Sequence, residues 1–381
     1  MTRRRSHVDD LRGATRLAAE ATLGVAEVVQ AMQVTIGGGP ALLGAPLAGA
    51  VRLVTTPVHA GIRAVTSLVA STLDGALAAL APLVGDGAPG PAREAVLAAL
   101  NGVLGDYLHA TGNPLALGLH LHVSEPHGAR LLVLVHGLSM SHHQWNRNGH
   151  NHGTALAAEL GYTPVFVAYN SGRHISDSGE ALATALEELV AGWPVPVEEI
   201  VLVGFSMGGL VARSAVHAAE QAAQGWRTRV RRMVTLGSPH HGSHLERGGN
   251  WAEVMLGISR YSAPIARLGR LRSAGITDLR WGNVIEAHWR DRDRFELGLD
   301  PRTPVPLPAG VATLAIAGSA SPAGSDALAG DGLVPVASAL GRHARPELQL
   351  AFDETRVVYA TKHLDLLASP DVLAALRAWL D

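Results

Sequence analysis

A serine between two glycines is the clearest chemical signal in the chain. In Gly204-Phe205-Ser206-Met207-Gly208, Ser206 follows the apolar run 200–203 and precedes the helical pattern that starts at Leu210. In a G-x-S-x-G segment, the small residues on both sides allow the sharp turn that joins a strand to a helix. The turn exposes the hydroxyl at the helix N-terminus, where the helix dipole favours developing negative charge. We therefore predict that Ser206 is a nucleophile.

A serine hydroxyl is a weak nucleophile until a base takes its proton, and that base needs a carboxylate to orient it. For a serine on such a turn, the expected chain order is Ser, then Asp or Glu, then His. Asp331 lies in a Gly-Asp-Gly turn after the apolar run 311–317, and His363 follows the apolar run 357–360. These positions predict His363 as the base and Asp331 as its partner.

The same chemistry needs backbone N–H groups that bind the oxyanion of a tetrahedral intermediate. The segment Val135-His136-Gly137-Leu138 ends the apolar run 131–135. We expect the amide of Leu138 to supply one donor and the amide of Met207, directly after the serine, to supply the other. His136 is expected to make a structural hydrogen bond and not to transfer protons.

The elements that must position these residues are indicated by apolar runs that alternate with helical patterns. Strands are predicted at 131–135, 165–169, 200–203, 233–236, 311–317 and 357–360, and helices near 152–160, 179–192 and 207–224. A last helix begins at Pro370 with Ser369 as its N-cap. Continuous apolar runs suit parallel strands buried on both faces. The alternation predicts an α/β fold with a doubly wound, mostly parallel sheet.

From about Leu131 to its end, the chain resembles the lipase and esterase branch of the α/β-hydrolase superfamily. The resemblance rests on short segments, which are His136-Gly137, Gly204-Phe-Ser-Met-Gly208-Gly209, Leu236-Gly-Ser-Pro-His-His-Gly242, Asp331-Gly-Leu-Val and His363-Leu-Asp. The segment 236–242 is similar to those of true bacterial lipases and of GPI inositol-deacylase-like hydrolases. The resemblance implies an α/β-hydrolase fold and a carboxylic-ester hydrolase with a Ser-His-Asp triad and an acyl-enzyme. An acyltransferase on the same fold and a catalytically silent scaffold remain as alternatives.

Residues 243–308 separate two predicted strands without a clear strand between them, and an insertion of this length is typical of a cap or lid. We expect its aromatic and aliphatic residues to line an apolar channel over the site and its arginines to face solvent. The predicted substrate is a small-molecule or lipid ester with an apolar acyl group. A fixed cap over a pocket for small polar esters is the alternative.

Residues 1–112 are rich in Ala, Leu, Val and Gly and predict a helical N-terminal extension before an α/β-hydrolase domain at 113–381. Helices are expected near 12–33, 47–83 and 92–108. The expected role is a brace against the catalytic domain. Contact with a lipid surface or a protein partner is the alternative.

Composition narrows the function classes. The net charge is −2 with 17% charged residues, which argues against a nucleic-acid-binding protein. There is no cysteine, so disulfides and thiol catalysis are excluded. The basic start is followed by acidic residues and not by an apolar run, and no uninterrupted apolar window could span a bilayer. These features predict a cytoplasmic protein and say nothing of its oligomeric state.

Metal and cofactor sites are not predicted. Histidines occur close together in the chain without a carboxylate at close ligand spacing, at positions 142, 143, 150, 152, 240 and 241. In bacterial lipases, the aspartate of His-Leu-Asp often holds a structural calcium with a second aspartate upstream. No aspartate lies between Asp300 and Asp326 to be that partner. We therefore expect Asp365 to orient the loop of His363.

Overall fold

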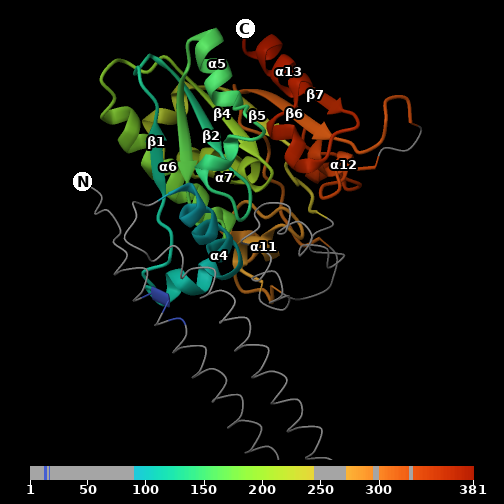
Figure 1. Cartoon of the computed structure of the whole chain (residues 1–381). Helices are drawn as coiled ribbons and strands as arrows, with labels where there is room; N and C mark the ends of the chain where they lie inside the picture. Colours follow the sequence, from blue (N-terminus) through green and yellow to red (C-terminus); the bar gives the residue numbers. More distant parts are fainter. Residues whose placement is uncertain (1–12, 15–16, 18–89, 244–271, 295–299, 326–328) are drawn as a thin grey trace, which may run out of the picture. The chain divides into compact units, whose positions relative to one another are not determined.

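The structure is a computed structural model that describes residues 13–14, 17, 90–243, 272–294, 300–325 and 329–381 (Figure 1). The chain forms two compact units, one of Met1–Arg93 with Thr111–Leu115 and one of Glu94–Ala110 with Ala116–Asp381. The helices expected near 12–33 and 47–83 lie almost wholly outside the described residues. The third expected helix is α4, Pro91–Ala110, and from Glu94 onward it belongs to the larger unit. A division of the chain at residue 112 stays a prediction.

The larger unit is built on a seven-stranded sheet with the order β1-β3-β2-β4-β5-β6-β7. Strand β1 runs antiparallel to β3, and all other neighbours are parallel. The strands are β1 His120–Val123, β2 Arg130–Val135, β3 Thr163–Ala168, β4 Glu199–Phe205, β5 Val230–Leu236, β6 Ala312–Gly318 and β7 Glu354–Val358. The predicted fold class, an α/β fold with a doubly wound and mostly parallel sheet, is confirmed.

Helices cover both faces of this sheet (Figure 1). The side chains of Leu131, Val133 and Val135 pack in one core with α6 and α7, whereas Leu132 and Leu134 pack in a second core with α5 and α13. Successive side chains of a strand point to opposite faces, so a strand covered on both faces is apolar at every position. The covering helices are α5 His152–Leu160, α6 Ile175–Ala191, α7 Met207–Gln221 and α13 Pro370–Leu380.

Strands β2 to β7 were predicted, but β1 was not. This strand is short and lies at the edge of the sheet, and its two histidines are exposed. The sequence His-Leu-His-Val is too brief an alternation to distinguish from a loop. In contrast, the last helix begins at Pro370 as predicted, and Ser369 accepts a hydrogen bond from the amide of Val372.

The remaining described elements are short and lie in the connections. They are η3 His142–Trp145, η4 Gly225–Arg229, α11 Ala274–Asp278, η5 Glu286–His288, α12 Val336–Ala339, η6 Pro346–Leu348 and η7 His363–Leu367. The described parts of the insertion 243–308 contain α11 and η5 and no strand. Within the described ranges, no helix has both the length and the apolar character that crossing a bilayer requires.

Candidate active site

The carboxyl ends of four parallel strands meet at one edge of the sheet. Val135 of β2 is paired with Gly204 of β4, Phe205 with Leu236 of β5, and Leu236 with Ile316 of β6. The turns that follow these strands are therefore neighbours. Ligand sites of open α/β sheets lie at this edge.

Ser206 occupies the turn between β4 and α7 in a conformation that is rare for residues other than glycine. Its φ is 53° and its ψ is −124°, a strained region of backbone space. Two hydrogen bonds hold the turn, from the Ser206 amide to Leu236 O at 2.8 Å and from the Gly209 amide to Ser206 O at 3.1 Å. The hydroxyl-bearing residue is thus fixed at the N-terminus of α7.

The two glycines around Ser206 are required by close backbone contacts. A Cβ atom at Gly204 would lie 2.3 Å from the Cα of Gly209, and one at Gly208 would lie 2.1 Å from Val135 O. No side chain fits at these distances. This is the physical reason for the G-x-S-x-G pattern in this chain.

Asp331 and His363 are brought into direct contact although 32 residues separate them. Nδ1 of His363 lies 2.7 Å from Oδ2 of Asp331, and the His363 amide donates to Asp331 O at 2.9 Å. The other carboxylate oxygen, Oδ1, accepts from the amides of Leu333 and Val334 at 3.0 and 2.9 Å. Since a carboxylate only accepts hydrogen bonds, Nδ1 is the donor of this contact, and in a neutral ring Nε2 is then the nitrogen without a proton.

Both side chains are buried beside the turn of Ser206. Asp331 is 2% exposed and His363 is 5% exposed. The ring of Phe205, the residue before the serine, lies 4.9 Å from the His363 ring. A Cβ atom at Gly237 would lie 3.1 Å from Asp331 Oδ2 and 3.3 Å from His363 Cε1. The three residues predicted to act together therefore lie at one edge of the sheet.

The two residues predicted as oxyanion donors flank Ser206. Met207 is the first residue of α7, where helix amides have no partner within the helix. Leu138 follows Gly137, where an added Cβ would lie 3.1 Å from the Cβ of Ser206. Both amides thus belong to segments that contact or adjoin the serine.

The turn that carries Leu138 is held by two residues that the sequence did not indicate. The hydroxyl of Tyr169 donates to His136 O at 2.8 Å, and its ring stacks on His136 with the centroids 4.4 Å apart. The next residue of the turn, Ser139, has a φ of 58° and donates its amide to Ser171 Oγ at 2.8 Å. Tyr169 and Ser171 follow β3, and no motif distinguishes them in the sequence.

His136 makes a local hydrogen bond, in line with the structural role expected for it. Its Nδ1 lies 2.8 Å from Gly137 O. Burial lowers the pKa of His136 from 6.5 to about 4. The ring is therefore neutral near pH 7 and donates from Nδ1 to the Gly137 carbonyl.

The shifted pKa of His136 predicts acid-sensitive stability. The pKa is about 4 in the folded protein and 6.5 in the unfolded chain, so the unfolded state binds more protons between these values. The contribution of His136 is therefore complete above pH 6.5 and is lost as the pH falls toward 4, by about 3 kcal/mol in all. Urea unfolding from pH 7 to pH 4.5 measures this loss. His136→Asn should show a shallower pH dependence, and equal slopes for the two proteins would contradict the assignment.

Two contacts with residues outside the predicted triad hold the loop of His363 in place. Asp365, half exposed, forms an ion pair with Arg147 at 3.5 Å. Nε2 of His152 lies 2.9 Å from Leu366 O, and burial lowers the pKa of His152 to about 4. A neutral His152 thus donates to the backbone of η7. The ion pair with Arg147 is consistent with the expected role of Asp365, which is to orient the loop of His363.

The expectation that the arginines of the insertion face solvent is wrong for Arg280 and Arg302, which are buried. Arg302 pairs with Asp300 at 2.7 Å and donates to His240 O at 2.8 Å. Buried guanidinium groups of this kind are stable only when their donors are paired. The neighbouring His241 has its Nδ1 3.1 Å from Arg302 Nη2, so the histidine pair 240–241 belongs to this network. The exposed arginines of the described insertion are Arg290, Arg292 and Arg294.

The described part of the insertion packs beside the nucleophile turn. The amide of Gly275 donates to Gly172 O at 3.1 Å, and an added Cβ at Gly275 would lie 3.1 Å from Met207 Cε. Trp289 stacks on His174 with the centroids 3.6 Å apart. The residues expected to line an apolar channel lie mostly outside the described residues, namely Trp251, Met255, Leu256, Ile258, Tyr261, Ile265 and Leu268.

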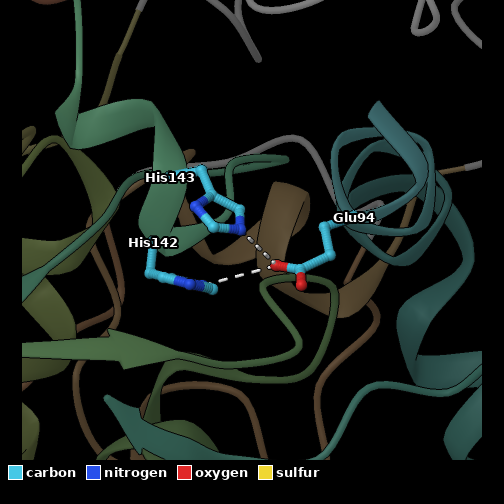
Figure 2. Close-up of side chains that lie close together, drawn as sticks. All are labelled: Glu94, His142 and His143. Atoms are coloured by element: carbon cyan, nitrogen blue, oxygen red, sulfur yellow. Dashed lines mark ion pairs between the residues drawn. The ribbon is translucent and has the colours of Figure 1, made fainter. Parts of the chain in front are cut away.

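A carboxylate that is distant in the sequence contacts His142 and His143. Glu94 of α4 reaches both, with its Oε2 3.6 Å from His142 Nδ1 and 3.2 Å from His143 Nε2 (Figure 2). Burial, together with the neighbouring rings of His122 and His143, lowers the pKa of His142 to about 3. No local pattern indicates this contact, because 48 positions separate Glu94 from His142.

Comparison with known proteins gives one family model and a set of solved structures. A family model described as a domain of unknown function, DUF7379, matches residues 109–278, which include Ser206 but not Asp331 or His363. No curated protein matches the chain.

Several solved structures align with about two thirds of the chain. The mature lipase BlEst2 of Bacillus licheniformis is 21% identical, with 68% of this chain and 98% of that chain covered and a TM-score of 0.45. A lipase-esterase related protein from Clostridium acetobutylicum is 12% identical, with 69% and 99% covered and a TM-score of 0.41. The RedJ thioesterase of Streptomyces coelicolor is 18% identical, with 67% and 94% covered and a TM-score of 0.37.

Proposed function

We propose that the protein is a serine-dependent carboxylic-ester hydrolase that works through an acyl-enzyme. The observation that carries this proposal is the buried hydrogen bond between His363 Nδ1 and Asp331 Oδ2, 2.7 Å long, beside the strained turn of Ser206. A histidine oriented in this way has its basic nitrogen free to activate a serine. The chain order Ser, Asp, His is the one expected when the serine lies on a strand-to-helix turn.

In the proposed reaction, Ser206 Oγ attacks the ester carbonyl while His363 Nε2 takes the hydroxyl proton. The amides of Leu138 and Met207 donate to the oxyanion that forms. The C–O bond to the alcohol then breaks, and His363 returns the proton to the leaving alcohol. Water attacks the acyl-enzyme with His363 again as the base, and the acid leaves with Ser206 restored.

A fluorophosphonate probe tests the nucleophile independently of the substrate. We expect one covalent adduct per chain, located on the peptide that contains Ser206. Protein unfolded before exposure should not react, because the activating histidine is then absent. The control variant is Ser325→Ala, which removes a serine that is not part of the predicted triad. It should be labelled like the wild type. A folded protein that forms no adduct would contradict the proposal.

Tyr169 is proposed as a positioning residue for the turn that carries Leu138. In Tyr169→Phe, the turn loses one hydrogen bond to His136 O. Since a hydrogen bond contributes about 1 kcal/mol, kcat should fall ~3- to 10-fold while KM stays the same. Tyr162→Phe is the matched control, because its hydroxyl accepts from Arg130 near the start of β2. A change in KM alone, or an equal loss in the control, would contradict this role.

We further propose that the substrate has an apolar acyl group. Support comes from α11, which packs against Met207, and from the aromatic and aliphatic residues of the insertion to which α11 belongs. We expect the insertion, which follows β5 at the same edge of the sheet, to cover the serine. Small polar esters under a fixed cap are the competing substrate class.

A series of p-nitrophenyl esters from acetate to palmitate distinguishes these substrates. Each buried methylene contributes up to about 0.8 kcal/mol, so kcat/KM should rise up to ~4-fold per methylene until the channel is full. The series should be measured below the micelle concentration of each ester. A maximum at acetate with a steep fall by butyrate would leave a small-ester esterase.

A further inference from the structure

Three side chains of metal-binding type converge from two distant segments. Glu94 lies in the first turn of α4, and His142 and His143 open η3, which follows the turn of Leu138. Both rings are directed at the Glu94 carboxylate (Figure 2). This cluster has no part in the proposed ester hydrolysis.

The spacing of the donor atoms fits a small divalent ion. Zinc is bound at about 2.0–2.2 Å by nitrogen and oxygen ligands, so two ligands of a tetrahedral site lie ~3.4 Å apart. Oε2 of Glu94 lies 3.2 Å from His143 Nε2 and 3.6 Å from His142 Nδ1. The three ligand atoms all lie within 4.8 Å of one another. Small side-chain rotations would bring the three atoms to one centre.

The donor set selects a class of metal. Two imidazole nitrogens and one carboxylate oxygen suit Zn²⁺ and its first-row neighbours, whereas Ca²⁺ and Mg²⁺ prefer sites made of oxygen. We propose that Glu94, His142 and His143 bind one Zn²⁺-type ion, with a fourth position for water.

One of the three side chains also packs against a neighbouring ring. The ring of His122 stacks on that of His142, with the centroids 3.7 Å apart and 12° between the planes. The side chain of His142 is 13% exposed, while those of Glu94 and His143 are about one-third exposed. One ring is thus fixed from β1, and the site remains open to ions from solvent. Outer contacts that orient a ligand raise its affinity for the metal.

A bound ion would join α4 to the segment that carries the Leu138 turn. The same helix contacts this turn through Gly102, where an added Cβ would lie 2.7 Å from the Cβ of Ser139. The ion would therefore hold together two segments that already pack at one point. We expect it to act on stability, whether or not the protein hydrolyses esters.

Calorimetric titration of the full-length protein with ZnCl2 tests the site. The protein should carry no histidine tag and should first be stripped with EDTA and dialysed. We expect one ion per chain, a rise in Tm on Zn²⁺ addition, and visible absorption of four-coordinate Co²⁺ when cobalt replaces zinc. Glu94→Gln and His143→Ala should each weaken Zn²⁺ binding at least ~100-fold. Loss of a residue that only orients a ligand weakens metal binding by ~100-fold at most.

The control variant is His127→Ala, which removes an exposed histidine whose ring lies 4.9 Å from Trp193. It should bind Zn²⁺ like the wild type. All variants should match the wild type in circular dichroism and in Tm in EDTA, so that loss of binding is separate from loss of folding. Absence of saturable binding, or equal binding by Glu94→Gln and the wild type, would overturn the proposal. If Glu94→Gln lowered Tm relative to the wild type by the same amount in EDTA and in Zn²⁺, the three residues would form an ion pair and not a metal site.

Discussion

Ser206→Ala is expected to remove ester hydrolysis, with kcat lower by ~10⁶-fold, as when the nucleophile of a serine protease is deleted. No other atom at the turn can form the acyl-enzyme. The fold should persist because alanine keeps the Cβ atom, and the strain of a φ of 53° is therefore unchanged. Turnover of p-nitrophenyl butyrate measures the effect, and circular dichroism and Tm verify the fold.

Ser214→Ala is the matched control for this experiment. Ser214 is buried in the same helix, α7, two turns beyond the nucleophile, and its loss should leave kcat within a small factor of the wild type. The serine assignment would be wrong if folded Ser206→Ala kept more than a few per cent of the activity.

Asp331→Asn should lower kcat by ~10⁴-fold with little change in KM, by analogy with the same substitution in serine proteases. The hydrogen bonds of Asp331 give the reason. The amides of Leu333 and Val334 both donate to Oδ1, so the oxygen of an asparagine must remain there. Its NH2 group then faces Nδ1 of His363 and donates to it. The ring proton moves to Nε2, which can no longer accept the proton of Ser206.

The comparison that tests this argument is Asp365→Asn. Asp365 adjoins the same loop, but its side chain is half exposed and forms an ion pair with Arg147. Surface ion pairs contribute about 1 kcal/mol or less, so kcat should fall ~5-fold at most. If Asp365→Asn were the more damaging of the two, Asp331 would not be the partner of His363. Asp326, another aspartate of this region, lies outside the described residues.

Much of the fold could be predicted from local sequence because the signals are short-range. The runs 131–135 and 200–203 are apolar at every position, which is what a strand covered on both faces requires. The G-x-S-x-G pattern and the start of α13 are also recognised from residues within a few positions. The order Ser206, Asp331, His363 is the one expected for a serine on such a turn, and the direct contact of Asp331 with His363 agrees with it.

Other features depend on pairs of residues that are far apart in the chain. Helix α6 was expected from residue 179, yet it begins at Ile175, whose amide donates to Asp278 Oδ2 at 2.9 Å. An N-terminus capped by a side chain about 100 positions away leaves no local signal. The burial of Arg302 also depends on distant residues, because its guanidinium donates to the carbonyl oxygens of His240 and Gly282.

The sequence by itself therefore determined the parallel sheet, the serine turn and the candidate residues of the active site. Only the tertiary structure decided that Tyr169 and Ser171 hold the turn of Leu138 through hydrogen bonds to His136 and Ser139. It also brought Glu94 to His142 and His143, in a cluster that the proposed reaction does not use. The physical reason is the range of the interactions. Apolar periodicity and turn geometry act between near neighbours in the chain, whereas hydrogen bonds and ligand sets join residues that folding alone brings together.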